Sequence, residues 1–183
     1  MEAKRENPWK TLSKREVYAN PWIKVSHCEV LNPAGKEGIY GVVSFRNKAI
    51  GVIPVNEQLE TWLVGQFRYT LDEYSWEIPE GGGPDDEAPE TTAIRELQEE
   101  TGLIAAKIEL LGKIHTSNSV TDEVGFIFLA ENLRQAEANP EDTEDISVWK
   151  LPLADAIRMV ERGEITDSLS MAGLLMAARK FGI

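Results

Sequence analysis

The sequence predicts a layered α/β fold that follows a β-rich N-terminal segment. Two short apolar runs of the buried-strand type precede residue 70, a helical pattern begins near residue 86, and further strands and helices alternate after it. The chain has 183 residues, of which 42% are hydrophobic. That length and composition suit one compact core under a soluble surface and exclude a wholly disordered chain.

The first 45 residues are expected to be rich in β-structure and too poor in apolar positions to fold well alone. Residues 23–31 and 38–45 have strand character, and a turn at 32–35 separates them. A segment that cannot bury its own apolar residues has a reason to associate. We therefore expect residues 1–45 to be a dimerisation element of a homodimer, and residues 46–183 to form the main domain.

Residues 46–183 show alternating strand and helix signals. Buried-type strands are predicted at 49–55 and 61–69, later strands at 106–115, 123–130 and 146–151, and helices at 153–162 and 168–181 with a break around Gly163. The first helix is predicted to start at Asp86 as N-cap, with Pro89 in its first turn and a stop at Gly102. An apolar stripe of Ala93, Ile94 and Leu97 supports that helix.

The charge balance is strongly acidic. Nineteen basic and 31 acidic residues give a net charge of −12, which argues against nonspecific binding to nucleic acid or to anionic membranes. Between Glu80 and Glu100 lie eight acids and one base, so this stretch holds −7 of the −12. The ordinary interpretation of such a run is a solvated face.

The composition also indicates a cytoplasmic protein. Cys28 is the only cysteine, so no intrachain disulfide is possible, and in an expected strand it is a packing residue. The first ten residues lack the apolar core of a signal peptide, and no stretch approaches the roughly 18 apolar residues that span a bilayer. We expect no membrane and no nucleic acid partner.

The acidic run has a stricter pattern than composition requires. Residues 81–103 read G-x5-E-x7-R-E-U-x-E-E-x-G-U, where U is aliphatic. A chance match is on the order of 10⁻⁷ from ordinary residue frequencies. The pattern resembles the signature of the Nudix hydrolase family, which implies an α/β/α sandwich with a mixed sheet over residues 46–183. Asp86 stands where many members carry glycine, at a position that the signature leaves free.

The spacing of the glutamates has a physical reason. On a helix, Glu96, Glu99 and Glu100 fall at i, i+3 and i+4, so their carboxylates project from one face. Clustered carboxylates repel unless divalent cations occupy them, and all-oxygen ligands suit Mg²⁺, or Mn²⁺, better than zinc. By resemblance, Glu96 and Glu100 are the main metal ligands, Glu99 assists in metal binding and catalysis, and the carbonyl of Glu80 completes the set.

The remaining signature residues have structural roles by the same resemblance. Arg95 and Glu87 are expected to form an internal ion pair that braces the loop onto the helix, although such a pair is also an ordinary surface feature. Gly81, at the head of a glycine run, is expected to let the loop bend beside the metals, and Gly102 ends the helix.

The residues before the signature point to one branch of the family. Gln66-Phe67-Arg68 ends a predicted strand, and Trp76-Glu77-Ile78-Pro79-Glu80-Gly81 leads into the signature. Both are similar to the ADP-ribose and nucleoside diphosphate sugar pyrophosphatase branch, which implies hydrolysis of such a substrate to a nucleoside monophosphate and a sugar phosphate. Arg68 would pair with a phosphate or a ribose, because a guanidinium fork matches such oxygens; a surface strand arginine is the alternative.

Two further assignments come from that branch. Its catalytic base lies in a loop that aligns with residues 116–123, where Glu123 is the candidate and Asp122 the competitor. Here the loop departs from the Ser-Pro-Gly form of relatives. In the same branch an aromatic residue of the N-terminal part, which two subunits often exchange, stacks on the nucleobase. Tyr18 and Trp22 offer flat rings for that role or for ordinary packing.

Several other functions remain open at this stage. Within the family they are nucleoside triphosphate hydrolysis, dinucleoside polyphosphate cleavage and RNA 5′-end processing, and the last fits poorly because the chain lacks an evident basic track. A different class is a module that senses a nucleotide sugar without cleaving it.

Overall fold

The protein, seen in a computed structural model, divides into two compact units, and residues 6–138 and 145–183 are described. The N-terminal unit comprises the chain up to Arg46 together with Ser117–Glu123, and the core unit comprises Asn47–Thr116 and Val124–Ile183. The division after Arg46 lies close to the expected boundary at residue 45. The assignment of Ser117–Glu123 to the N-terminal unit is not visible in the sequence.

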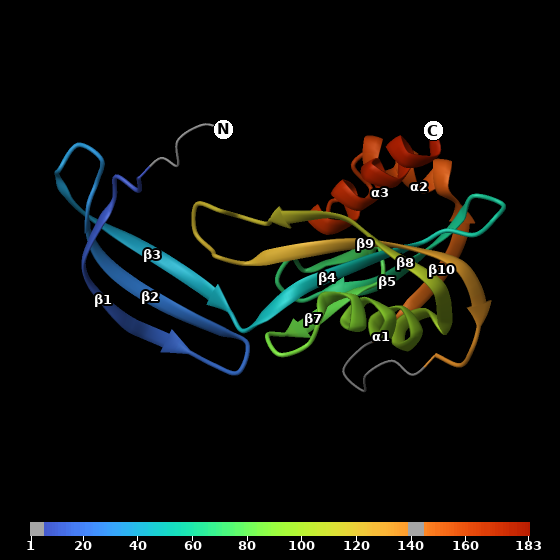
Figure 1. Cartoon of the computed structure of the whole chain (residues 1–183), viewed down its shortest axis with the longest axis horizontal. Coiled ribbons are helices and arrows are strands. Elements are labelled where there is room, and N and C mark those ends of the chain that lie inside the picture. The colour runs from blue at the N-terminus through green and yellow to red at the C-terminus, as the bar shows by residue number, and fades with distance from the viewer. Residues whose placement is uncertain (1–5, 139–144) are drawn as a thin grey trace. The chain divides into compact units, whose positions relative to one another are not determined.

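The N-terminal unit is an antiparallel sheet of β1 (Lys10–Ala19), β2 (Ile23–Leu31) and β3 (Glu37–Phe45), in that order (Figure 1). Between β2 and β3 the Asn32 side chain accepts hydrogen bonds from the N–H groups of Ala34 and Lys36, at 2.9 and 3.1 Å, and Gly35 takes a φ of 75°. These contacts form the predicted turn. Every residue of β1 is exposed, whereas Cys28 of β2 is buried.

The segment Ser117–Glu123 is attached to β3 by hydrogen bonds. The Val43 N–H donates to the Val120 carbonyl at 2.9 Å, and the Tyr40 hydroxyl donates to the Ser119 carbonyl at 2.7 Å. The Ser44 hydroxyl donates to the Asp122 carboxylate at 2.7 Å. Backbone and side-chain contacts therefore both fix this loop to the N-terminal unit.

The core unit contains two sheets. The four-stranded sheet has the order β7-β4-β9-β8, formed by β7 (Glu80–Pro84), β4 (Asn47–Pro54), β9 (Val124–Gln135) and β8 (Leu103–His115). Its β4–β9 pair is parallel and its other pairs are antiparallel, so the sheet is mixed as expected. The second, antiparallel sheet has the order β10-β5-β6, formed by β10 (Ser147–Pro152), β5 (Glu60–Arg68) and β6 (Glu73–Glu77).

The sheets lie between α1 (Pro89–Thr101) on one side and α2 (Leu153–Glu161) with α3 (Ser168–Phe181) on the other (Figure 1). Side chains of β4 alternate between the two layers: Ile50 and Val52 belong to the apolar cluster that includes Leu97 of α1, while Ile53 belongs to the cluster that includes Leu174 of α3. A strand buried on both faces is the middle layer of a sandwich. The predicted α/β/α sandwich is confirmed.

The start of α1 differs from the prediction. Its N-cap is Ala88, not Asp86, and Ala88 has an extended backbone with φ −68° and ψ 134°. The residue before a proline is disfavoured in the helical region, so Pro89 forces Ala88 to be extended and the helix to begin after it. Gly102 ends α1 in the left-handed conformation, with φ 68°, as predicted.

Three strands were not predicted individually: β1, β6 and β7. The glycine run of β7 is paired rather than looped, because Gly81, Gly82 and Gly83 lie opposite Ile50, Ala49 and Lys48 of β4.

Among the described residues, no helix is long and apolar enough to cross a membrane.

Candidate active site at the β7–α1 junction

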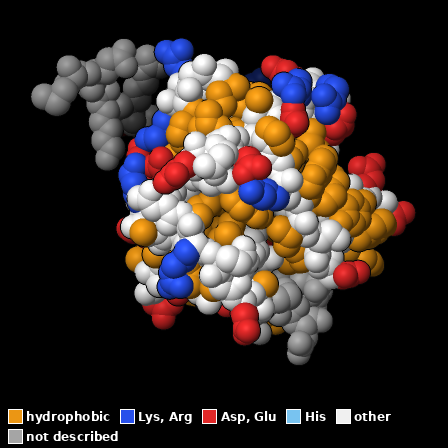
Figure 2. Space-filling view, turned by 90° about the vertical axis from the view of Figure 1, so that its right-hand side faces the viewer, with side chains coloured by type: hydrophobic (Ala, Val, Ile, Leu, Met, Phe, Trp, Pro, Cys, Tyr) orange, Lys and Arg blue, Asp and Glu red, His pale blue; other side chains and the backbone are white. Residues whose placement is uncertain are grey.

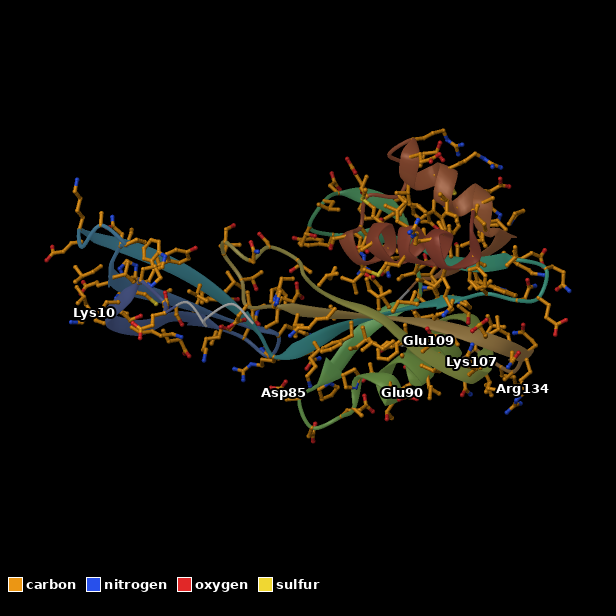
Figure 3. The ribbon with its side chains drawn as sticks, turned by 45° about the horizontal axis from the view of Figure 1, so that its top comes forward. Lys10, Asp85, Glu90, Lys107, Glu109 and Arg134 are labelled. Carbon is orange, nitrogen blue, oxygen red and sulfur yellow. The ribbon has the colours of Figure 1, made fainter. Side chains whose placement is uncertain are left out.

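The acidic run of residues 80–100 separates into two groups in the structure. Asp85, Asp86 and Glu90 are exposed, and Figure 3 labels Asp85 and Glu90 near the start of α1. Glu96 and Glu100 point inward and are only 9% and 2% exposed. The solvated-face interpretation therefore applies to part of the run, and the helix face carrying Glu96 and Glu100 requires another explanation.

The start of β7 contacts that buried face of α1. The Glu80 N–H donates to Glu100 Oε2 at 2.8 Å. At the next residue, a Cβ built on Gly81 would overlap the carboxylate of Glu96. The backbone of Gly81 is not in the left-handed region, so backbone strain does not exclude a side chain here. The overlap with Glu96 does, and glycine is required for as long as Glu96 keeps this position. The structure brings Glu80, Gly81, Glu96 and Glu100 together.

Arg95 joins three glutamates of the signature. Its Nη1 lies 2.8 Å from Glu96 Oε1 and 2.8 Å from Glu99 Oε2, and its Nη2 lies 3.6 Å from Glu87 Oε2. Nη2 also donates to the Gly82 carbonyl at 3.2 Å. The expected contact with Glu87 is present, and the guanidinium additionally spreads its charge over Glu96 and Glu99.

Arg68, at the end of β5, lies between two carboxylates. Its Nε donates to Glu77 Oε1 and Oε2 at 2.9 and 3.1 Å, and its Nη2 contacts Glu77 and lies 3.0 Å from Glu80 Oε1. The hydrogen bonds to Glu77 raise the pKa of Arg68 above its already high ordinary value, so the guanidinium stays charged. Glu77 belongs to the motif of residues 76–81, and the sequence alone did not indicate a role for it.

The Glu80 carboxylate is buried in surroundings that disfavour its charged form. Burial, together with the negative charges of Asp167 and Glu77, raises its pKa well above the ordinary value, and Arg68 only partly offsets this. Its Oε2 is buried and accepts no hydrogen bond from the residues that the structure describes. Buried polar atoms are normally paired, so such an oxygen marks a place where a cation or a donor fits.

The donor set of this junction fits a divalent cation of the magnesium type. All its side-chain donors are carboxylate oxygens, which Mg²⁺ and Mn²⁺ prefer. Within residues 6–138 and 145–183, no three acidic, histidine or cysteine side chains stand in the arrangement of a preformed metal centre. Mg²⁺ is commonly held by one or two carboxylates plus waters and substrate phosphates, so the residues fit without a closed cage.

A cavity of about 460 Å³ opens beside the junction within the core unit. It is lined by Arg68, Glu77 and Glu80 and by polar residues of the β5–β6 turn, of β6 and of the segment that leads into α3: Thr70, Ser75, Thr166, Asp167 and Ser168. The α3 start is fixed here because Asp167 caps it, accepting from the Ser170 N–H at 2.7 Å, while the Ser170 hydroxyl accepts from the Ile78 N–H at 2.9 Å.

The other predicted site residues belong to the N-terminal unit. Tyr18 of β1 is 55% exposed and Trp22 of the β1–β2 turn is 70% exposed, so both rings are accessible within that unit. Asp122 accepts the hydrogen bond from Ser44, and the Glu123 N–H donates to the Thr121 hydroxyl at 3.1 Å.

Comparison with known proteins agrees with this geometry. The NUDIX domain model matches residues 45–170, and the model of the nucleoside diphosphate sugar hydrolase N-terminal domain matches residues 9–43. The chain therefore belongs to the NUDIX family of hydrolases, whose members generally use divalent metal ions.

Particular relatives extend over most of the chain. ADP-ribose pyrophosphatase of Bacillus subtilis is 35% identical over 161 residues, covering 87% of this chain and 86% of the relative. ADP-ribose pyrophosphatase of Mycobacterium tuberculosis is 31% identical over 178 residues, covering 93% and 83%. A crystal structure of an ADP compounds hydrolase has a TM-score of 0.87 at 18% identity, covering 98% of this chain and 97% of that one. This last likeness shows the fold.

Proposed function

We propose that this chain hydrolyses the diphosphate of ADP-ribose or a related nucleoside diphosphate sugar, giving a nucleoside monophosphate and a sugar phosphate. The observation that carries the proposal is the junction where Glu80, Glu96 and Glu100 meet beside a polar cavity that Arg68 lines. Two relatives above 30% identity bear the name ADP-ribose pyrophosphatase, and the N-terminal model bears the name of nucleoside diphosphate sugar hydrolases.

The roles of the residues follow from their chemistry. Glu96, Glu100 and the Glu80 carbonyl are proposed to hold Mg²⁺, or Mn²⁺, with help from Glu99. The bound cations would neutralise the diphosphate, polarise its oxygens and lower the pKa of the attacking water. Arg95 keeps Glu96 and Glu99 oriented through contacts of 2.8 Å each. Neutralisation by the bound cations explains how a chain of net charge −12 would accept an anionic substrate.

Glu123 is proposed as the catalytic base that orients or deprotonates the water. Asp122, its competitor, is committed to the Ser44 hydroxyl at 2.7 Å. The matched pair Glu123→Gln and Asp122→Asn separates them: the first is expected to lower kcat at least 100-fold and the second less than about 3-fold, given the usual 10²–10⁴ contribution of a general base. The opposite ranking would transfer the role to Asp122.

Substrate contacts are proposed for Arg68, Tyr18 and Trp22. Arg68 lines the cavity with its side chain 35% exposed, and it would reach a phosphate or ribose oxygen there. Tyr18 or Trp22 would stack on the nucleobase. On the face shown in Figure 2, Lys and Arg side chains lie in separate places among Asp, Glu and uncharged side chains.

We also propose a cytoplasmic homodimer formed through the N-terminal unit. In β1 every residue is exposed, and large apolar side chains of the unit are open to solvent, among them Leu12, Val17, Trp22 and Ile39. Exposed apolar surface of this kind marks an association site. Light scattering is expected to give twice the 20.4 kDa of one chain, and a monomer at micromolar concentration would refute the dimer.

The activity is tested with a substrate panel analysed by product mass. ADP-ribose, ADP-glucose, GDP-mannose, UDP-glucose, diadenosine polyphosphates and deoxynucleoside triphosphates are incubated with Mg²⁺ or Mn²⁺. We expect a nucleoside monophosphate and a sugar phosphate from at least one diphosphate sugar. Preference for a triphosphate or a dinucleoside polyphosphate would redirect the proposal within the family. Tight binding of ADP-ribose with no product would instead indicate a sensing module.

A further inference from the structure

Glu77 is a buried carboxylate for which metal binding and hydrolysis, as proposed above, provide no direct role. It ends β6, and its side chain is 3% exposed. Both of its oxygens accept from Arg68, at 2.9 and 3.1 Å, in a bidentate pair. A buried ion pair is weak support for stability, because apolar residues of similar volume often serve as well. The buried pair of Glu77 and Arg68 therefore needs an explanation other than stability.

Arg68 transmits the position of Glu77 to Glu80. The same Nη2 that contacts Glu77 lies 3.0 Å from Glu80 Oε1. The Glu80 side chain is thereby drawn toward β5, while its N–H donates to Glu100 at 2.8 Å. The Glu80 backbone is thus tied to α1, and its side chain is tied to Arg68.

The geometry points to Glu77 as a positioning residue that, through Arg68, fixes Glu80 against α1 so that its main chain and the Glu96 and Glu100 carboxylates present a cation site. This inference rests on the proposed function for the identity of that site. It also gives Arg68 a second task besides substrate contact: bidentate pairing fixes the plane of the guanidinium, and that plane decides where Nη2 holds Glu80. Groups that orient metal ligands typically change metal affinity or activity about 10–100-fold when altered.

The test compares the Mn²⁺ affinity of four variants in the absence of substrate. Binding is measured by electron paramagnetic resonance or by calorimetry. Glu77→Gln keeps the shape of the side chain but loses the bidentate acceptor. Arg68→Lys keeps the positive charge and loses the fork. Both are expected to weaken Mn²⁺ binding about 10-fold or more, and the Mg²⁺ concentration for half-maximal hydrolysis should rise with them.

Two matched controls separate position from charge. Asp167→Asn removes a negative charge from the same cavity and keeps the α3 cap, since asparagine caps as well as aspartate. It is expected to change Mn²⁺ affinity less than about 3-fold. Glu73 lies at the exposed end of β6, directly opposite Arg68. The Glu73→Gln variant is expected to have the Mn²⁺ affinity of the wild type.

The outcomes are decisive in each direction. Unchanged Mn²⁺ binding by a folded Glu77→Gln protein overturns the inference, as does a wild-type protein that binds no Mn²⁺. Equal weakening by Asp167→Asn with no effect of Arg68→Lys shows a charge effect and also overturns it. If Glu77→Gln does not fold by circular dichroism, Arg68→Lys decides alone. A wild type that binds Mn²⁺ but cleaves no substrate of the panel refutes the function and leaves this inference standing.

Discussion

Replacement of Gly81 by alanine should impair the proposed metal site and leave the fold intact. A Cβ at this position would overlap the carboxylate of Glu96, which is 9% exposed and held by Arg95. The backbone of Gly81 is not left-handed, so its conformation accommodates alanine and only the overlap with Glu96 opposes the substitution. The overlap is therefore relieved by rotation of the Glu96 side chain away from β7, which removes a proposed metal ligand from its place.

The expected change in stability is small because two effects oppose each other. Alanine restricts the unfolded chain and gains about 0.4–1 kcal/mol. Turning Glu96 away weakens its contact with the partly exposed Arg95, which costs about 0.2–1 kcal/mol. The net change in the free energy of unfolding is thus within about 1 kcal/mol, which for a chain of this size is a Tm shift of no more than about 4 °C.

The expected change in function is large. Altering only the surroundings of a metal ligand commonly costs about 10–100-fold, so displacing the ligand itself should lower Mn²⁺ affinity and kcat by about 100-fold. The assays are Mn²⁺ titration, ADP-ribose hydrolysis in Mg²⁺, and thermal unfolding with a chelator present.

Gly82→Ala is the matched control. The side chain it adds would meet the flexible Asn47 amide instead of a carboxylate, at 2.7 Å from Nδ2. Its kcat should stay within about 3-fold of the wild type. The reasoning is refuted if Gly81→Ala retains wild-type Mn²⁺ affinity, or if Gly82→Ala loses as much.

Two further substitutions test the site and its support. Glu100→Gln should lower kcat more than about 100-fold with the fold intact, since the amide oxygen can still accept from the Glu80 N–H; wild-type turnover in Mg²⁺ would contradict the metal assignment. Ser170→Ala should destabilise by about 1–3 kcal/mol, because the buried Ile78 N–H loses its acceptor. Ser168→Ala, exposed on the same helix turn, should cost less than about 0.5 kcal/mol by chemical denaturation, and equal losses would disprove the explanation.

The sequence was sufficient for features that depend on local pattern. The α3 bounds, the left-handed stop at Gly102 and the Asn32 turn all follow from residues adjacent in the chain. The exception is the start of α1, where two local signals compete. Asp86 is a good N-cap, but Pro89 forces its predecessor to be extended, and the proline constraint prevailed.

Features that depend on distant contacts were not predictable. β1 is exposed throughout, so no alternation of apolar and polar residues marks it. The glycines of β7 have low strand propensity, and they pair with β4 in a fold that places Gly81 against Glu96. The partners of Arg68 are Glu77 at the end of β6 and Glu80 at the start of β7, which lie 9 and 12 residues away in sequence. No periodicity of the sequence connects them to an arginine at the end of β5.

The attachment of Ser117–Glu123 to β3 limits how parts of this protein can be exchanged with relatives. The loop lies between β8 and β9 in the sequence, but its hydrogen bonds go to Tyr40, Val43 and Ser44. A chimaera that replaced only the first 46 residues would pair a foreign β3 with this loop and lose side-chain contacts that hold the segment ending at Glu123. The N-terminal sheet and this distant loop depend on each other's contacts, so a chimaera should take both from the same parent protein.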